Sequence, residues 1–131
     1  EYAFTNDWFT QNIPVWDQML AALKPQRILE IGAFEGRATC YLIEKFNDCE
    51  DGLEVHCVDT WQGGVEHEKS PMAGVEGRFD ANIESALSRV SKPVRVIKHK
   101  KLSSHALVDL IGAGHRDRFA QARTTDRDTA W

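Results

Sequence analysis

Hydrophobic and polar positions change their spacing repeatedly along residues 1–111. Short, mostly apolar runs are typical of strands buried in a parallel sheet, whereas apolar residues three and four positions apart are typical of helices that cover it. The pattern predicts strands over about residues 27–31, 54–59 and 94–97. It predicts helices over about residues 13–23, 36–46, 79–90 and 104–111. Because helices and strands alternate, we expect an α/β domain whose parallel strands are joined by right-handed crossovers.

A glycine-containing turn follows the first predicted strand. Glu30 lies near the end of that strand, and Gly32 and Gly36 come immediately before the next helix. A strand, a glycine turn and a helix in this order let a nucleotide-like ligand contact bare backbone. The second strand ends in Asp59, and an acid at this position usually holds a ribose diol. The two strand ends together predict a site for a nucleoside-bearing cofactor.

The spacing of the two glycines distinguishes between cofactors. Dinucleotide sites favour the pattern G-x-G-x-x-G, because its middle glycine admits the pyrophosphate at the helix N-terminus. Here Ala33, Phe34 and Glu35 separate the two glycines. Phe34 and Glu35 put bulk and negative charge where a pyrophosphate would sit. A nicotinamide-dependent dehydrogenase half-domain is therefore the less favoured alternative.

The pattern E-x-G-x-x-x-G at residues 30–36 resembles motif I of class I S-adenosylmethionine-dependent methyltransferases. Other segments, in the same order and with sensible spacing, are similar to a bacterial group of small enzymes of this class. These segments are residues 6–9, 15–16, 29–32, 36–40, 58–64 and 79–83. The resemblance covers about residues 5–111 and is the strongest indication of function in the sequence.

This resemblance implies a Rossmann-like, three-layer αβα methyltransferase fold with parallel strands in the order 3-2-1. It implies that S-adenosylmethionine is the cofactor and that the expected reaction is methyl transfer to a small-molecule acceptor, with oxygen as one candidate atom. The cofactor has no phosphate and carries cationic groups, so a carboxylate at Glu30 would favour its binding. The resemblance implies cofactor contacts from Glu30, Gly32, Ala33, Gly36, Asp59, Thr60 and Trp61. Trp61 is expected either to stack on adenine or to pack on the helices, and no catalytic residue is assigned.

The hydrophobic pattern ends after residue 111. Residues 112–131 contain only Phe119 and Trp131 as large apolar side chains, whereas the family likeness would require a fourth strand and then three more. We therefore expect residues 1–111 to be the N-terminal, cofactor-binding half of a methyltransferase domain, and residues 112–131 to be a disordered or foreign tail. The strand over residues 27–31 would then be a bare sheet edge, which favours self-association.

A chain truncated in this way is expected to transfer little or no methyl group by itself, because the missing half normally completes the substrate pocket. A cofactor-binding fragment or an interaction module without turnover is the alternative to an enzyme. Calorimetry with S-adenosylhomocysteine and with NAD would distinguish the first two possibilities, the methyltransferase and the fragment or module without turnover, from the third, the dehydrogenase half-domain.

Composition and charge exclude several classes of partner. The formal net charge is −4, which argues against a general nucleic-acid or membrane-surface partner. No apolar run approaches the roughly 20 residues that a membrane span requires. The three cysteines, Cys40, Cys49 and Cys57, lack metal-type spacing, so we expect reduced thiols, no metal site and a cytoplasmic location.

The segment over residues 60–78 shows no periodicity and is long for a strand-to-helix connection, so we expect a mobile lid. His67 within it is either a base or metal ligand or, more simply, a solvated side chain beside Glu66 and Glu68. Outside this segment, we expect two further sets of residues to be solvent-exposed: His99, His105 and His115, and the basic cluster Lys98, Lys100 and Lys101.

Overall fold

The computed structural model describes residues 1–45, 52–63, 72–113 and 120–123. After a short 3-10 turn at Thr10–Asn12, the helices are α1 (Ile13–Leu23), α2 (Arg37–Lys45), α3 (Val75–Leu87) and α4 (Ser103–Gly112). The strands are β1 (Arg27–Ile31), β2 (Leu53–Asp59), β3 (Val94–Lys100) and β4 (Ala120–Arg123). All the helices and strands that the sequence predicts are present, with shifts of a few residues at their ends.

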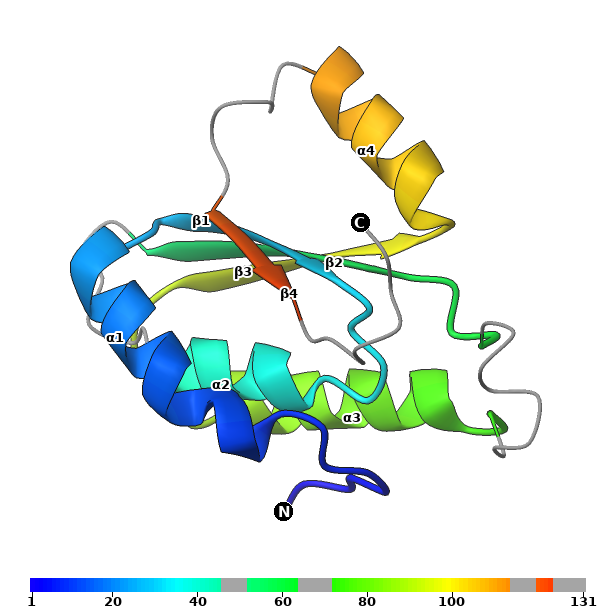
Figure 1. Cartoon of the computed structure of the whole chain (residues 1–131). Coiled ribbons are helices and arrows are strands. Elements are labelled where there is room, and N and C mark those ends of the chain that lie inside the picture. The colour runs from blue at the N-terminus through cyan, green and yellow to red at the C-terminus, as the bar shows by residue number, and fades with distance from the viewer. Residues whose placement is uncertain (46–51, 64–71, 114–119, 124–131) are drawn as a thin grey trace.

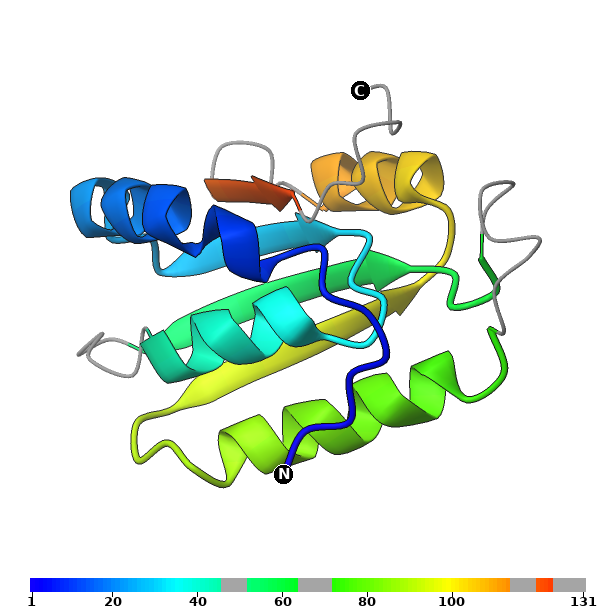
Figure 2. The same ribbon diagram turned by 60° about the horizontal axis from the view of Figure 1, so that its bottom comes forward.

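The strands form one open sheet in the order β3-β2-β1-β4, and every neighbouring pair is parallel. As predicted, β2 lies between β1 and β3. Helices α2 and α3 cover one face of the sheet and α4 covers the other (Figures 1 and 2). The predicted α/β class with one parallel sheet is therefore confirmed.

Strand β4 lies beside β1, with Ala120 opposite Ile28 and Arg123 opposite Ile31 (Figure 1). The prediction that β1 forms a bare edge, with no strand after residue 111, is wrong. The sequence Ala-Gln-Ala-Arg lacks the β-branched and aromatic residues that usually mark a strand, so its hydrophobic pattern carries no signal. Pairing with β1 occupies backbone groups that would otherwise be exposed at that edge. The predicted self-association through β1 therefore loses its structural basis.

The core has two parts, one on each face of the sheet. Ile28 of β1 packs in the larger cluster, together with apolar residues of α1, α2 and α3. Leu29 and Ile31, whose side chains alternate with that of Ile28, join Ala106 and Leu110 of α4 in the smaller cluster. Burial on both faces explains why β1 is almost continuously apolar.

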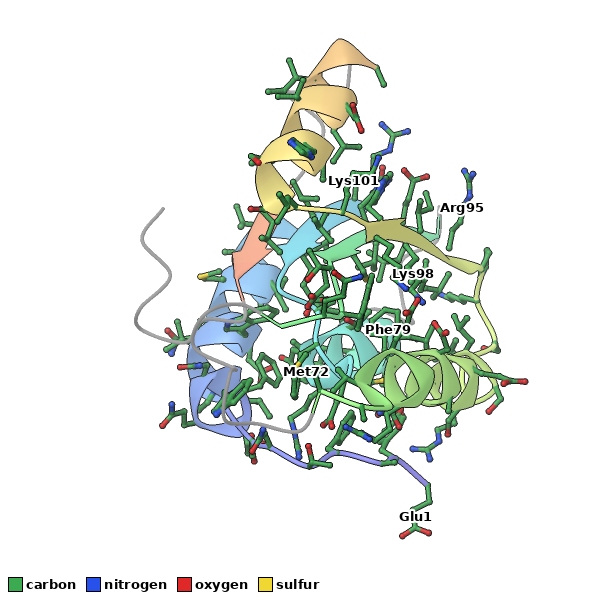
Figure 3. All side chains as sticks on the ribbon, turned by 90° about the vertical axis from the view of Figure 1, so that its right-hand side faces the viewer. Glu1, Met72, Phe79, Arg95, Lys98 and Lys101 are labelled. Atoms are coloured by element: carbon green, nitrogen blue, oxygen red, sulfur yellow. The ribbon has the colours of Figure 1, made fainter. Side chains whose placement is uncertain are left out.

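Helix α3 begins at Val75, earlier than the predicted residue 79, and β3 extends to Lys100, beyond the predicted residue 97. The two differences have one cause, because basic residues at the end of β3 pair with acidic residues near the start of α3. Lys98 Nζ lies 2.7 Å from Glu76 Oε1 and 2.8 Å from Asp80 Oδ1. Figure 3 shows Lys98 below β3, on the side of Phe79, and Arg95 on the opposite side. A hydrophobic pattern does not detect strand residues that are stabilised by ion pairs.

The predicted lid is shorter than expected, because α3 takes up the end of the aperiodic segment. Of the connection between β2 and α3, residues 64–71 lie outside the described part of the chain, and with them His67. The mobility of this connection therefore stays a prediction. Among the helices that the structure describes, none has both the length and the apolar character that a membrane crossing requires.

Candidate cofactor site at the carboxyl ends of β1 and β2

Asp59 connects the glycine turn after β1 with the loop after β2. The backbone N–H of Phe34 donates a hydrogen bond to Asp59 Oδ2 at 2.8 Å, and the backbone N–H of Trp61 donates to Oδ1 at 2.9 Å. Phe34 has φ 48° and Trp61 has φ 54°, so both are in the left-handed region that non-glycine residues rarely adopt. One carboxylate thus holds two strained turns against each other. The structure brings together the two strand ends that the sequence predicts to share a site.

Trp61 packs inside the protein. Its indole N–H donates to the carbonyl oxygen of Phe34 at 2.8 Å, which ties the two loops together a second time. The ring centroid lies 4.9 Å from that of Phe79, and Lys98 Nζ lies 4.7 Å from the indole centroid. With 4% of its surface exposed, Trp61 offers almost no ring face to an adenine. Of the two roles expected for Trp61, packing is the one that its surroundings favour.

The two glycines of the turn have different environments. Gly32, with φ 83°, is exposed at the end of β1, and its N–H donates to the carbonyl oxygen of Val58 at 2.9 Å. Gly36, with φ 80°, is buried beneath α3, and its N–H donates to the carbonyl oxygen of Ala33 at 2.7 Å. Gly32 therefore exposes bare backbone at the open edge of the sheet, whereas Gly36 closes the turn and permits close packing.

Replacing Gly36 with alanine is expected to lower the free energy of unfolding by about 1–3 kcal/mol. A Cβ atom there would lie 3.0 Å from Phe79 Cδ2 and 3.3 Å from Ile83 Cδ1, in addition to the strain of a positive φ. Urea denaturation measures the effect. Gly77→Ala is the matched control, because a Cβ atom at Gly77 meets nothing within 4 Å. Equal stability of the two variants would contradict the assigned packing role.

Glu30 lies beneath the site rather than at its surface. Its side chain is fully buried, with Thr39 Oγ1 donating to Oε2 and Cys57 Sγ 3.8 Å from the same oxygen. Oε1 has no hydrogen-bond partner. Burial raises the pKa of the Glu30 carboxyl to about 8, and the nearby charge of Asp59 adds to this effect, while the bond from Thr39 opposes it. Glu30 is therefore buried and mostly protonated at neutral pH, whereas the resemblance implies a carboxylate that contacts the cationic cofactor.

Glu35 binds the N-terminal segment to the glycine turn through hydrogen bonds. Thr5 donates to its carboxylate from the backbone N–H at 2.7 Å and from Oγ1 at 2.6 Å, and Arg78 Nε donates at 2.7 Å. Burial opposes ionisation of Glu35, but these hydrogen bonds outweigh it and lower its pKa. The side-chain amide of Asn82 donates to the carbonyl oxygens of Glu35 and Ala3, at 2.9 and 3.1 Å. Sequence reasoning found none of these long-range contacts, although Asn82 lies in a segment that carries the family resemblance.

The N-terminal segment also covers the start of α2 (Figure 2). Arg37 Nε donates to the carbonyl oxygen of Asn6 at 3.1 Å and lies 3.8 Å from Asp7 Oδ1. The ring centroids of Trp8 and Phe34 are 5.0 Å apart. The helix N-terminus, where a pyrophosphate would bind in a dinucleotide site, is thus next to a protein segment and a buried carboxylate.

The remaining predicted contact residues are Ala33, which is buried, and Thr60, which is half-buried. Thr60 Oγ1 accepts a hydrogen bond from the backbone N–H of Gln62 at 3.3 Å. No protein-family model, curated protein or solved structure matches the chain. Within the described ranges, no group of three or more His, Cys, Asp or Glu side chains is arranged to hold a metal ion.

Three of the residues predicted to be exposed, His99, Lys98 and Lys101, are half-buried instead. His99 is half-buried, and its Nε2 lies 2.8 Å from Nδ1 of His56. Lys98 and Lys101 are half-buried and form ion pairs with Glu76 and Asp109, whereas Lys100 is exposed, as predicted, and also pairs with Glu76. The predictions for His105, which is exposed, and for Cys40 and Cys57, which are buried free thiols, are also confirmed. His115 and Cys49 lie outside the described residues.

Proposed function

We propose that the edge formed by the Gly32–Gly36 turn and by Asp59 binds S-adenosylmethionine, and that the chain provides the cofactor-binding part of a methyltransferase for a small-molecule acceptor. The observation that supports this most is the hydrogen bond of 2.8 Å from the Phe34 N–H to Asp59, because it joins the two expected cofactor segments. The finer assignment, to the N-terminal half of a Rossmann-like methyltransferase fold, rests on the sequence resemblance together with the parallel sheet.

Asp59 retains capacity for a ribose diol. An ionised carboxylate has about four positions at which it accepts hydrogen bonds. Two of these are occupied by the N–H groups of Phe34 and Trp61, and the side chain is half-buried rather than enclosed. The remaining positions suit two hydroxyl groups. The exposed backbone at Gly32 allows a flat nucleoside to approach the sheet edge closely.

The surroundings of α2 favour a cofactor without phosphate. Glu35, immediately before the turn closes, is buried and held ionised by Thr5 and Arg78. Arg37, at the first position of α2, is already paired with the backbone of Asn6 and with Asp7. A pyrophosphate would meet a fixed negative charge and a cation that is already engaged. S-adenosylmethionine avoids both obstacles.

Bound S-adenosylmethionine would supply an electrophilic methyl group on a sulfonium. The chain would contribute by holding that cofactor in line with the acceptor, and positioning of this kind provides much of the rate of group transfer. The described residues at the site offer Asp59 and Thr60 as hydrogen-bonding groups and no general base exposed at the Gly32 edge. An acceptor that ionises readily, or a base supplied from outside these residues, fits this arrangement.

In isothermal titration calorimetry, S-adenosylhomocysteine is expected to bind and NAD is not. Gly32→Val is expected to abolish binding, because a branched side chain would crowd the turn and strain its positive φ. Gly77→Val is the matched control, since it introduces the same side chain at an exposed helix position with nothing within 4 Å. A circular dichroism spectrum of each variant establishes that the fold is retained.

Binding of NAD in place of S-adenosylhomocysteine would overturn the proposal in favour of a dinucleotide site. Unchanged binding in Gly32→Val would place the ligand elsewhere. Binding of S-adenosylhomocysteine without methyl transfer to any acceptor tested would favour the alternative of a cofactor-binding part that does not turn over by itself.

A further inference from the structure

A concave site lies at the sheet edge opposite the proposed cofactor site, where β2 and β3 begin. It is a pocket of about 310 Å³, within the size range of small-molecule sites. Arg27, Glu54 and Arg95 line it together with the apolar Leu53 and Pro93. Since β2 runs from Leu53 to Asp59, the pocket lies roughly 20 Å from the edge that carries Asp59. It is therefore separate from the proposed cofactor site.

Two arginines in this pocket share one carboxylate at long distances. Arg27 Nε lies 4.0 Å from Glu54 Oε1, and Arg95 Nη1 lies 3.5 Å from Glu54 Oε2. The first distance is too long for a hydrogen bond and the second is at the limit of one. The side chains are 39% and 75% exposed, so both guanidinium groups are accessible from solvent. Figure 3 shows Arg95 extending away from β3 on the face opposite Lys98.

Glu54 is oriented by a histidine chain rather than by the arginines. His56 Nε2 lies 2.7 Å from Glu54 Oε1, and His56 Nδ1 lies 2.8 Å from His99 Nε2. His56 is buried, so the carboxylate has a short bond to a side chain with little freedom to move. Each guanidinium offers five N–H donors, whereas Glu54 supplies one carboxylate whose Oε1 is already bonded. Among these three charged side chains, N–H donors therefore outnumber acceptor positions.

The shape of the pocket depends on a close approach of the strand ends. A Cβ atom at Gly52 would lie 2.8 Å from the carbonyl oxygen of Pro93, and Gly52 has φ 83°. The Leu53 N–H donates to that same carbonyl oxygen at 3.1 Å. These contacts hold the start of β2 against β3, and the Glu54 N–H, which donates to the carbonyl oxygen of Gln26 at 2.9 Å, joins β2 to the chain beside Arg27.

We propose that this pocket is a binding site for a small oxyanion, either a phosphate monoester or a carboxylate, held between Arg27 and Arg95. Guanidinium groups bind both anions in bidentate fashion through charge-assisted hydrogen bonds. The three charged side chains have a net charge of +1, which attracts an anion, and the apolar Leu53 and Pro93 accommodate a short carbon skeleton. Nothing in this proposal depends on the cofactor bound at the other edge.

The test is a titration of the isotopically labelled protein with inorganic phosphate and, separately, with succinate, at constant ionic strength. Both are followed through the amide signals of Leu53 and Val94. Saturable binding is expected with at least one of the two anions. Tighter binding of phosphate would assign the site to phosphate monoesters, and tighter binding of succinate would assign it to carboxylates.

Three variants make the test specific. The double variant Arg27→Gln with Arg95→Gln is expected to weaken binding by about tenfold or more, because it removes both charged donors. Glu54→Gln is expected to tighten binding by about fivefold, since one like charge about 4 Å away is removed. Arg89→Gln, which removes one positive charge at an exposed residue outside the pocket, is expected to leave binding unchanged.

The proposal is overturned if neither anion shows saturable binding, or if the double variant and Arg89→Gln bind equally well. It is also overturned if Glu54→Gln weakens binding, because Glu54 would then hold the ligand rather than compete with it. Titration with S-adenosylhomocysteine in the double variant keeps the two sites apart, since the loss of anion binding is expected to leave cofactor binding intact.

Discussion

Replacing Asp59 with alanine is expected to lower the free energy of unfolding by about 2–4 kcal/mol and to abolish measurable binding of S-adenosylhomocysteine. The substitution removes the acceptor of two backbone N–H groups, those of Phe34 and Trp61. Both residues hold positive φ values, which persist only where surrounding contacts enforce them. Loss of the carboxylate releases both turns at once, so the effect on binding should exceed the loss of contacts to the ribose alone.

Two further variants separate these contributions. Asp59→Asn keeps one oxygen acceptor and the size of the side chain, and we expect it to lose about half as much stability as Asp59→Ala while still weakening cofactor binding. Thr60→Ala is the neighbouring control, because its hydroxyl accepts a single bond of 3.3 Å from Gln62 and should contribute little to stability. Denaturation curves and calorimetry measure the two effects. If Asp59→Ala retains full stability and full affinity, Asp59 neither holds the turns together nor belongs to the site.

The hydrophobic pattern was sufficient to predict β1, β2 and β3 and the sheet edge at which Gly32 and Asp59 lie. β1 and β2 are buried on both faces over most of their length, and each carries apolar residues on both faces. In a parallel sheet the carboxyl ends of neighbouring strands meet at one edge, so Gly32 and Asp59 had to be close. The contact between Phe34 and Asp59 confirms this closeness. Whether a cofactor binds there stays a prediction.

Contacts between distant segments could not be predicted, because they have no local signature. β4 contains no large apolar residue, so its backbone pairing with β1 leaves no mark in the hydrophobic pattern. The bonds of Thr5 and Arg78 to Glu35 join three separate segments, and nothing in the spacing of these polar residues indicates it. The burial of Trp61 depends likewise on Phe79, on the far side of the connection between β2 and α3.

The sequence predicts correctly that Glu30 lies in β1, but it does not predict that its side chain is buried. The sequence placed its carboxylate near the cationic cofactor, because it is close to the end of β1. Side chains alternate along a strand, however, and the side chain of Glu30 points under α2, toward Thr39 and Cys57. The exposed position at the edge belongs to Gly32. The buried carboxyl group of Glu30 is therefore expected to affect the stability of the fold more than the binding of a ligand.

Stability is expected to fall as the pH rises from about 5 to about 8, and Glu30→Gln is expected to remove most of this fall. The pKa of Glu30 is raised by burial from 4.5 to about 8 in the folded protein. Between these two values the unfolded chain releases the proton and the folded chain keeps it. The folded state then binds more protons, so stability decreases with pH through this window. At about 1.4 kcal/mol for each pH unit, the total is about 5 kcal/mol above pH 8.

Urea denaturation at pH 5 and at pH 8.5 measures this effect in the wild-type chain and in Glu30→Gln. A glutamine has nearly the shape of a protonated glutamate and cannot ionise, so the two proteins should be of similar stability at pH 5. At pH 8.5 the variant should be more stable by several kcal/mol, because it has no charge to bury. Glu84→Gln, at an exposed position of α3, is the control and should match the wild type at both pH values. The contradicting result is a difference in free energy of unfolding between the wild-type chain and Glu30→Gln that is the same at both pH values. Glu30 would then be ionised in the folded protein, and its Oε1 must have a partner that stabilises the charge.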